Sequence, residues 1–180
     1  MIKASLKNVC HLWLLIFFGL SSAVTSMADP LNFMVGDFTF VRPKTWEWDP
    51  ETRHARNIVM KLKVVDAQSD TFGYCVFIPS TNSPDALLSQ WKGYFKEKGD
   101  KLTFHSEKKE FGKHNVTYVN IEGTFPWRKK DLPNYGLLGA TIETKGTNVY
   151  IRLIAPKVVI EKNRTDFKEM VESAFKEGNL

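Results

Sequence analysis

The chain has 180 residues, with 25 Lys or Arg and 20 Asp or Glu, and its formal net charge is +5. This slight basic excess is too weak to indicate nucleic-acid binding, so no nucleic-acid partner is expected. Two cysteines, Cys10 and Cys75, exclude a disulfide-rich scaffold, while a hydrophobic content of 43% is enough for a packed core. The composition therefore favours a globular domain that is held together by apolar packing.

Residues 1–28 have the layout of a secretory signal peptide. Two lysines precede an uncharged apolar run over 12–20, and small residues at 26 and 28 match the positions before a cleavage site at Asp29. The run is about half as long as the roughly 20 residues that a membrane-spanning helix needs, so cleavage is favoured over a retained anchor. We therefore expect an exported protein, periplasmic or extracellular, with no transmembrane segment after cleavage.

Removal of the signal peptide leaves residues 29–180, which suit a single domain with one core. Cys75 is then the only cysteine, so no intrachain disulfide can form. It lies in the apolar stretch 73–79, where burial as a small hydrophobic side chain is favoured over reactivity.

Strand patterns come first in the predicted domain. Residues 37–43 alternate aromatic and small polar residues and end at Pro43, which predicts a short strand. Residues 55–66 place apolar side chains on one face at a period of two, which predicts a strand with one solvated face. Residues 71–79 are more continuously apolar, as expected for a strand that is covered on both faces.

The next segment has the features of a helix. Ser83 is a suitable N-cap, Pro84 suits the first helical position, and the apolar residues between 87 and 95 follow helical spacing. Gly99 is the predicted stop.

Two hairpins and a closing helix complete the prediction. Residues 101–125 indicate two strands joined near Gly112, and a loop is predicted over 126–134. Residues 135–144 and 149–156 then indicate a second hairpin, and a helix capped by Thr165 ends near Gly178. This order predicts an α+β domain, with a mostly antiparallel sheet flanked by helices.

Several short motifs lie along this order of elements: Pro43-Lys44-Thr45-Trp46, Arg53-His54-Ala55, Gln90-Trp91, Tyr150-Ile151-Arg152-Leu153 and Phe167-x-x-Met170-Val171-x-Ser173. The motifs and the order of the elements resemble the PsbP-like group of secreted proteins. The resemblance covers nearly all of residues 29–180. It implies an α/β/α sandwich, which that group shares with the Ran-binding Mog proteins. The known members are mostly accessory or interaction proteins, including an extrinsic photosystem subunit, rather than enzymes. Nothing in the sequence specifically marks photosystem attachment or Ran binding.

No catalytic constellation stands out. The sequence contains neither G-x-S-x-G nor a glycine-rich phosphate-binding motif, and its histidines are scattered. Asp49, Glu51 and His54 could assemble a weak metal site, but Arg53 and Arg56 compete for the same carboxylates, so local ion pairing is favoured. We expect no catalytic residue, no metal site and no cofactor.

The tryptophans divide into two groups. Trp46 and Trp91 are expected in the core. Trp48 has no periodic reason to be buried, and Trp127 stands beside Arg128 and two lysines. An aromatic ring next to cations suits an acidic glycan, an anionic lipid headgroup or an acidic protein patch. The alternative is an ordinary solvated loop.

The leading hypothesis is an exported, non-enzymatic accessory or binding protein, whose partner is a protein or an anionic envelope component. The alternative is a small-molecule-binding protein or an enzyme that uses a pocket between helix and sheet. A third interpretation is an envelope protein whose sheet edges pair with other chains. The sequence carries no signal for the oligomeric state. The candidate binding residues are Trp48, Arg53, Arg56, Trp127, Arg128 and Arg152.

Overall fold

The computed structural model describes residues 31–49, 58–66, 68 and 70–176. The predicted signal peptide and two of the candidate binding residues, Arg53 and Arg56, lie outside the described residues.

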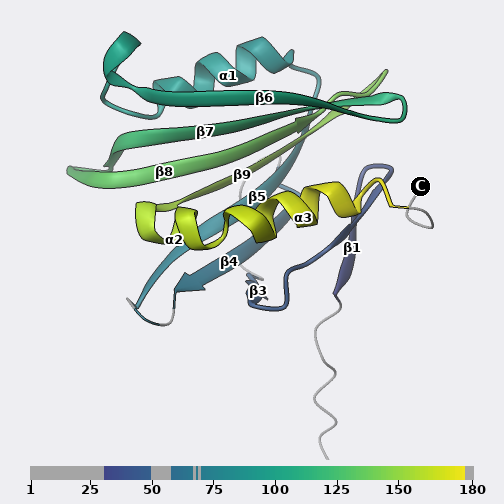
Figure 1. Ribbon diagram of the computed structural model, residues 1–180, viewed down its shortest axis with the longest axis horizontal. Coiled ribbons are helices and arrows are strands. Elements are labelled where there is room, and N and C mark those ends of the chain that lie inside the picture. Colours follow the sequence, from purple (N-terminus) through teal and green to yellow (C-terminus); the bar gives the residue numbers. More distant parts are fainter. Residues whose placement is uncertain (1–30, 50–57, 67, 69, 177–180) are drawn as a thin grey trace, which may run out of the picture.

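A seven-stranded sheet forms the centre of the described chain, and a separate two-stranded hairpin packs beside it (Figure 1). Every pair of neighbouring strands is antiparallel. The spatial order in the sheet is β3 (Trp46–Trp48), β4 (Met60–Asp66), β5 (Thr71–Ser80), β9 (Asn148–Pro156), β8 (Lys130–Ile142), β7 (His114–Trp127) and β6 (Thr103–Phe111). The hairpin consists of β1 (Asn32–Val35) and β2 (Phe38–Val41).

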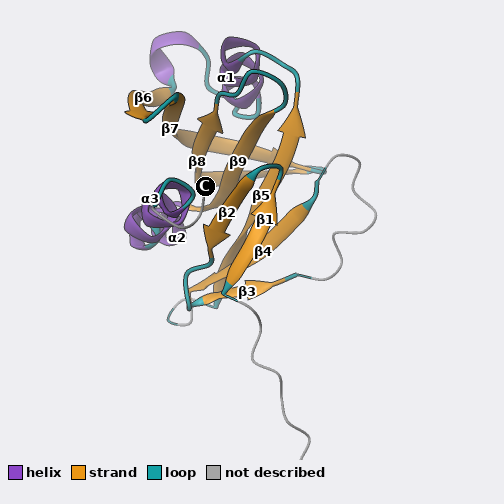
Figure 2. Cartoon of the chain, turned by 90° about the vertical axis from the view of Figure 1, so that its right-hand side faces the viewer, coloured by secondary structure: helices purple, strands orange, loops and turns teal. Residues whose placement is uncertain are grey.

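Helices cover both faces of the sheet, which confirms the predicted α+β fold. Helix α1 (Pro84–Gly93) lies on one face, while α2 (Lys157–Lys162) and α3 (Arg164–Ser173) lie together on the other (Figures 1 and 2). Leu137 and Leu138 of β8 illustrate this alternation, because Leu137 packs in the core beneath α1 and Leu138 in the core beneath α2 and α3. No helix in the described ranges is long and apolar enough to cross a membrane.

The core beneath α2 and α3 is the larger one and also receives the β1–β2 hairpin. Phe33 of β1 packs against Phe77 of β5 at a ring-centroid distance of 5.0 Å, and Phe40 of β2 packs against Phe77 at 5.2 Å. Cys75 is fully buried here, as predicted, and burial raises the pKa of its thiol. Trp46 is also fully buried, as predicted.

Helix α1 begins as the sequence indicates but ends earlier. The Ser83 hydroxyl accepts a hydrogen bond from the backbone N–H of Ala86 at 3.3 Å, and Pro84 occupies the first turn. The helix ends at Gly93, so the prediction of Gly99 as its stop is wrong. Beyond the helix, the backbone N–H of Lys96 donates to the carbonyl of Thr124 in β7, which draws the chain towards the sheet.

The loop predicted over 126–134 is also wrong. Strand β7 continues to Trp127 and β8 begins at Lys130, so Arg128 and Lys129 form a two-residue turn. Arg128 adopts a φ of +57°, which lets the chain reverse within two residues. Pairing between β7 and β8 continues through residues whose polar composition predicted a loop. The register of this pairing shifts between Gly123 and Phe125, as at a β-bulge.

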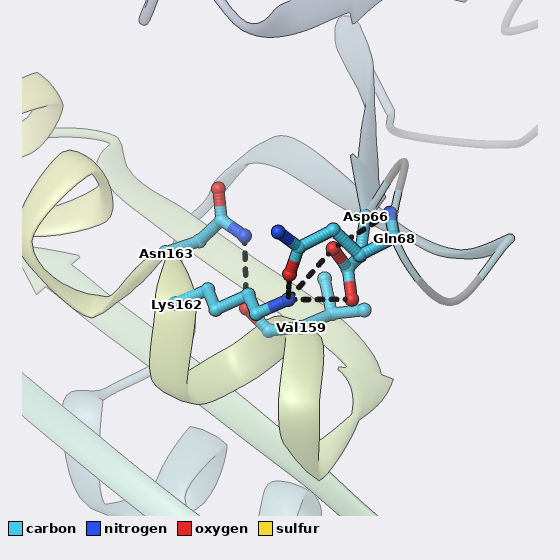
Figure 3. A network of polar contacts seen from close by, with 5 residues as sticks. All are labelled: Asp66, Gln68, Val159, Lys162 and Asn163. Atoms are coloured by element: carbon cyan, nitrogen blue, oxygen red, sulfur yellow. Dashed lines mark hydrogen bonds and ion pairs between the residues drawn. The ribbon is translucent and has the colours of Figure 1, made fainter.

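The end of the chain contains two helices where one was predicted. Asn163, rather than Thr165, precedes α3, and its side chain joins α2 to β3. The Asn163 amide donates to the Val159 carbonyl at 2.9 Å (Figure 3) and accepts from the Trp46 indole N–H at 2.8 Å. A buried hydrogen bond therefore fixes the helix junction against the first strand of the sheet.

An ion pair secures the same helix to the end of β4. The Lys162 ammonium donates to both oxygens of the buried Asp66 carboxylate, at 2.9 and 3.0 Å, and to the Gln68 side-chain oxygen at 2.8 Å (Figure 3). Because the carboxylate is buried and the ammonium is partly exposed, the pair neutralises a charge that would otherwise be costly to bury.

The packing of α1 predicts the effect of adding one methyl group. A Cβ atom at Gly139 of β8 would overlap the ring of Trp91, a residue of α1 that is almost fully buried against the sheet. We expect Gly139→Ala to lower the free energy of unfolding by about 1–3 kcal/mol in denaturant titrations, because the ring must shift in a filled core. The control is Gly146→Ala, where no atom lies within 4 Å of the new Cβ; it should change stability by less than about 0.5 kcal/mol. Equal effects would contradict this account of the α1 contact.

The helix junction yields a second stability prediction. Trp46→Phe removes the indole N–H and leaves the buried Asn163 oxygen without its donor, so we expect a loss of about 1–3 kcal/mol in unfolding free energy. Trp127→Phe makes the same change at a side chain that is 54% exposed, and it should shift stability by less than about 0.5 kcal/mol. If the Trp46→Phe protein were as stable as the Trp127→Phe control, the hydrogen bond between Trp46 and Asn163 would not stabilise the fold.

Candidate binding groove

An open groove of about 480 Å³ lies on the face of the sheet that carries α1. Strands β5, β7, β8 and β9 contribute most of its lining. We call it the aromatic groove and define it by the six side chains that dominate it: Phe72, Tyr74, Phe125, Trp127, Tyr135 and Arg152.

Three rings form a nearly parallel row along one side of the groove. Phe125 lies between Trp127 and Tyr135, with centroid distances of 6.2 and 5.9 Å and interplanar angles of 21° and 14°. Burial raises the pKa of the Tyr135 hydroxyl, so this group stays a neutral hydrogen-bond donor. Trp127 is 54% exposed and Phe72, on the opposite side of the groove, is 46% exposed. Exposed aromatic surface gathered around a concavity marks an interaction site.

Arg152 supplies the central charge of the groove. It is half-buried in the middle of β9, and its guanidinium lies 5.0 Å from the centroid of the Tyr94 ring and donates a hydrogen bond to the Tyr94 hydroxyl. Within the described ranges, no carboxylate lies within ion-pair distance of Arg152. A partly desolvated guanidinium in this position is suited to a bidentate interaction with a carboxylate from outside the chain.

Lysines stand at the β4 side of the groove. Lys61 Nζ lies 3.9 Å from the Tyr74 ring centroid and Lys63 Nζ lies 5.0 Å from the Phe72 centroid. Lys61 is neutralised by Asp49 at 2.6 Å. Arg152 and Lys63 have no ion pair in the described part of the chain, and they supply the positive charges of the site. Asp70, which also lines the groove, adds one negative charge.

The structure divides the residues that the sequence grouped as one surface. Trp127 and Arg152 line the groove, and the Arg128 guanidinium lies 5.8 Å from the Trp127 ring centroid at the adjacent turn. Trp48 lies on the other face of the sheet, where its ring packs edge-on against Phe33 at 5.3 Å. Arg53 and Arg56 fall outside the described residues.

Sequence reasoning missed four rings of the groove: Phe72, Tyr74, Phe125 and Tyr135. Phe72 and Tyr74 are two residues apart in β5 and therefore lie on the same face of the strand. The alternation of residues along this strand could have predicted that placement. Phe125 and Tyr135 join them through strand pairing across β7, β8 and β9, which no local pattern reveals.

A larger hollow of about 840 Å³ lies among the turns at the other end of the strands. Its polar groups already bond to one another: the ring of His114 is 3.1 Å from the Glu143 carbonyl, and the Thr144 hydroxyl donates to the Thr147 carbonyl at 3.0 Å. The aromatic groove is the stronger candidate, because its Arg152 guanidinium has no ion pair within the described ranges. No group of three or more histidine, cysteine, aspartate or glutamate side chains in the described chain is arranged to hold a metal ion.

No protein-family model matches the sequence, and no curated protein matches it in a sequence search. Solved structures do match the fold. The solution structure of the cyanobacterial PsbP protein CyanoP from Synechocystis sp. PCC 6803 superposes with a TM-score of 0.51 and 9% identity, covering 79% of this chain and 89% of CyanoP. PA94, a protein of unknown function from Pseudomonas aeruginosa, superposes with a TM-score of 0.49 and 10% identity, covering 82% of this chain and 97% of that one. At such low identity the likeness to CyanoP concerns the fold alone. The chain has a PsbP-like fold, as the sequence motifs implied.

Proposed function

We propose that this protein is an exported, non-enzymatic accessory protein that binds a segment of a partner protein in the aromatic groove. The segment carries a carboxylate side chain flanked by aromatic or aliphatic side chains. The observation that supports this most directly is Arg152, a half-buried cation without a carboxylate partner in the described chain, at the centre of a ring-lined groove.

The chemistry of the groove is that of a protein-binding hot spot. Tryptophan, tyrosine and arginine are enriched among the residues that dominate interface energetics, and all three types line this groove. Its volume of about 480 Å³ lies within the range of binding pockets and has room for several side chains. A carboxylate of the bound segment would pair with Arg152 and fix the position of the segment along the groove. Its apolar side chains would cover Phe72 and Trp127.

A protein partner fits the groove better than an anionic membrane surface does. Binding to anionic lipids depends on clusters of roughly four to eight cations. Here Arg152 lies within a groove rather than on a flat basic patch, and Asp49 neutralises the neighbouring Lys61. The PsbP-like fold is compatible with an accessory role.

A phage-displayed peptide library tests the groove directly. Selection against the wild-type protein should enrich peptides that have an aspartate or glutamate next to aromatic or aliphatic residues. A selected synthetic peptide should then bind Arg152→Gln roughly 10- to 100-fold more weakly in fluorescence titrations, since a hydrogen bond to a charged group is lost. Trp127→Ala should weaken binding as well.

Arg164→Gln is the matched control, because it makes the same change on the face of the sheet that α3 covers. It should leave the peptide affinity unchanged. Selected peptides without acidic residues, or equal affinity for the Arg152→Gln and wild-type proteins, would contradict the proposed site.

Export has its own test. When the full chain is expressed in a bacterium, we expect the protein in the periplasmic or extracellular fraction, with a mass that corresponds to a chain beginning at Asp29. This follows from the small residues at 26 and 28, which fit a cleavage site. An intact chain that retains Met1 and sediments with the membranes would overturn this part of the proposal.

A further inference from the structure

Strand β6 forms one border of the seven-stranded sheet, because it pairs with β7 on one side and with no described strand on the other (Figure 1). It is nine residues long, contains no proline and pairs with β7 without a register shift. Short length, prolines and bulges usually keep an exposed edge strand from pairing with another chain, and β6 has none of these. A fourth protective feature, a set of charged side chains, is present.

The turn between β6 and β7 identifies the backbone groups on the free side of β6. Gly112 and Lys113 form a two-residue turn, with Gly112 at a φ of +58°, so the residues that close the turn are hydrogen-bonded across the hairpin. Along an antiparallel strand, residues bonded to the neighbouring strand alternate with residues whose backbone groups point away from it. The groups that point away from β7 are therefore the backbone N–H and C=O of Phe104, Ser106, Lys108 and Glu110.

A second copy of the chain supplies a strand that can pair with this edge. Two copies related by a twofold axis perpendicular to the sheet align their β6 strands antiparallel. Bonded and non-bonded residue pairs alternate along such a ladder, so the axis must pass through a pair made of the same residue from each copy. The possible registers are therefore few, and each is defined by the residue at its centre.

Charge selects one of these registers. With Glu107 at the centre two carboxylates would oppose each other, and with Lys108 or Lys109 at the centre two ammonium groups would. Like charges directly opposite each other destabilise a strand pair. With Ser106 at the centre, two small neutral side chains face each other and the strands overlap over residues 103–109. A centre nearer either end of the strand shortens the overlap. The charges of β6 therefore favour the Ser106 register over its neighbours.

The flanking pairs in the Ser106 register are complementary. His105 lies opposite the partner's Glu107, whose carboxylate can accept a hydrogen bond from the imidazole. Phe104 lies opposite the partner's Lys108 on the other face of the strand. Lys92 Nζ already lies 3.7 Å from the centroid of the Phe104 ring, so the apolar stem of the partner's Lys108 makes this contact. Each of these pairs occurs twice because of the twofold symmetry.

We propose that this protein forms a twofold symmetric dimer, in which the β6 edges pair with Ser106 opposite the partner's Ser106 and join the two sheets into one. Because the axis is perpendicular to the sheet, both aromatic grooves lie on the same face of the joined sheet. Pairing uses the β6 edge of both copies, so the assembly stops at two chains. The dimer does not depend on what the aromatic groove binds, so either proposal can fail without the other.

Sedimentation velocity of residues 29–180 tests the dimer. Since one strand pair makes a small interface, we expect weak association, with a mass that rises from one chain to two between roughly 1 and 500 µM. A mass of one chain at every concentration would overturn the proposal. Assemblies larger than two chains would overturn it as well, because they require an edge other than β6.

Single cysteines test the register. Residues 29–180 contain only Cys75, which is fully buried, so an introduced cysteine is the reactive thiol. Ser106→Cys should form a disulfide between two chains under mild oxidation, because opposed bonded residues have Cα atoms about 5.5 Å apart, within the disulfide range.

Lys108→Cys is the matched control, because residue 108 is exposed on the same face of β6. In the Ser106 register the two copies of residue 108 lie four positions apart along the ladder, about 14 Å, so they should stay unlinked. Equal rates for the two variants would indicate random collision, and faster linking of Lys108→Cys would indicate another register. Either result would overturn the proposal.

A charge at the centre of the interface gives an independent test. Ser106→Glu places two carboxylates opposite each other and should weaken the dimer roughly fivefold or more in the same sedimentation measurement. Ser89→Glu makes the same change at an exposed position of α1 and should leave the dimer unchanged. Circular dichroism should show that both variants are folded, because both side chains are exposed. Equally tight dimers of the two variants would contradict the proposed interface.

Discussion

Strands β5, β9 and β8 bury apolar side chains on both faces, and the arrangement of the molecule depends on how each face is covered. The β1–β2 hairpin, α2 and α3 cover one face. Helix α1 covers only part of the other, because it ends at Gly93 and the chain then joins β7 through the Lys96 backbone. The uncovered part of that face is the aromatic groove. The ring of Trp91 against Gly139 sets how closely α1 approaches and therefore where the covered part ends.

The aromatic groove combines exposed rings with a guanidinium that has no ion pair in the described chain. In the aromatic groove the unmet requirement is an anion for the Arg152 guanidinium, and the surroundings are aromatic. This chemistry suits a segment of protein that carries a carboxylate side chain among apolar ones.

Local patterns predicted the elements that local physics controls. The Ser83 cap, the Pro84 start and the buried Trp91 follow from helical spacing and end effects, and the structure has all three. Predictions were wrong where strand pairing or contacts between distant segments prevail over local composition. The polar stretch 126–134 is drawn into a hairpin by its partner strand, and α1 stops before Gly99 because β7 binds the following backbone.

By itself the sequence determined the class of fold, the burial of Trp46, Trp91 and Cys75, and the candidacy of Trp127 and Arg152, because each depends on periodicity, composition or immediate neighbours. Only the tertiary structure decided which of these residues meet. Pairing of β9 with β5 and β8 brings Arg152 among rings from three other strands, and it leaves Trp48 on the opposite face. The packing of α3 on β6 and β7 likewise creates a pocket from residues that no motif connects. The physical reason is that strand order and helix placement arise from long-range burial, whereas a local pattern specifies only which face of its own element a side chain occupies.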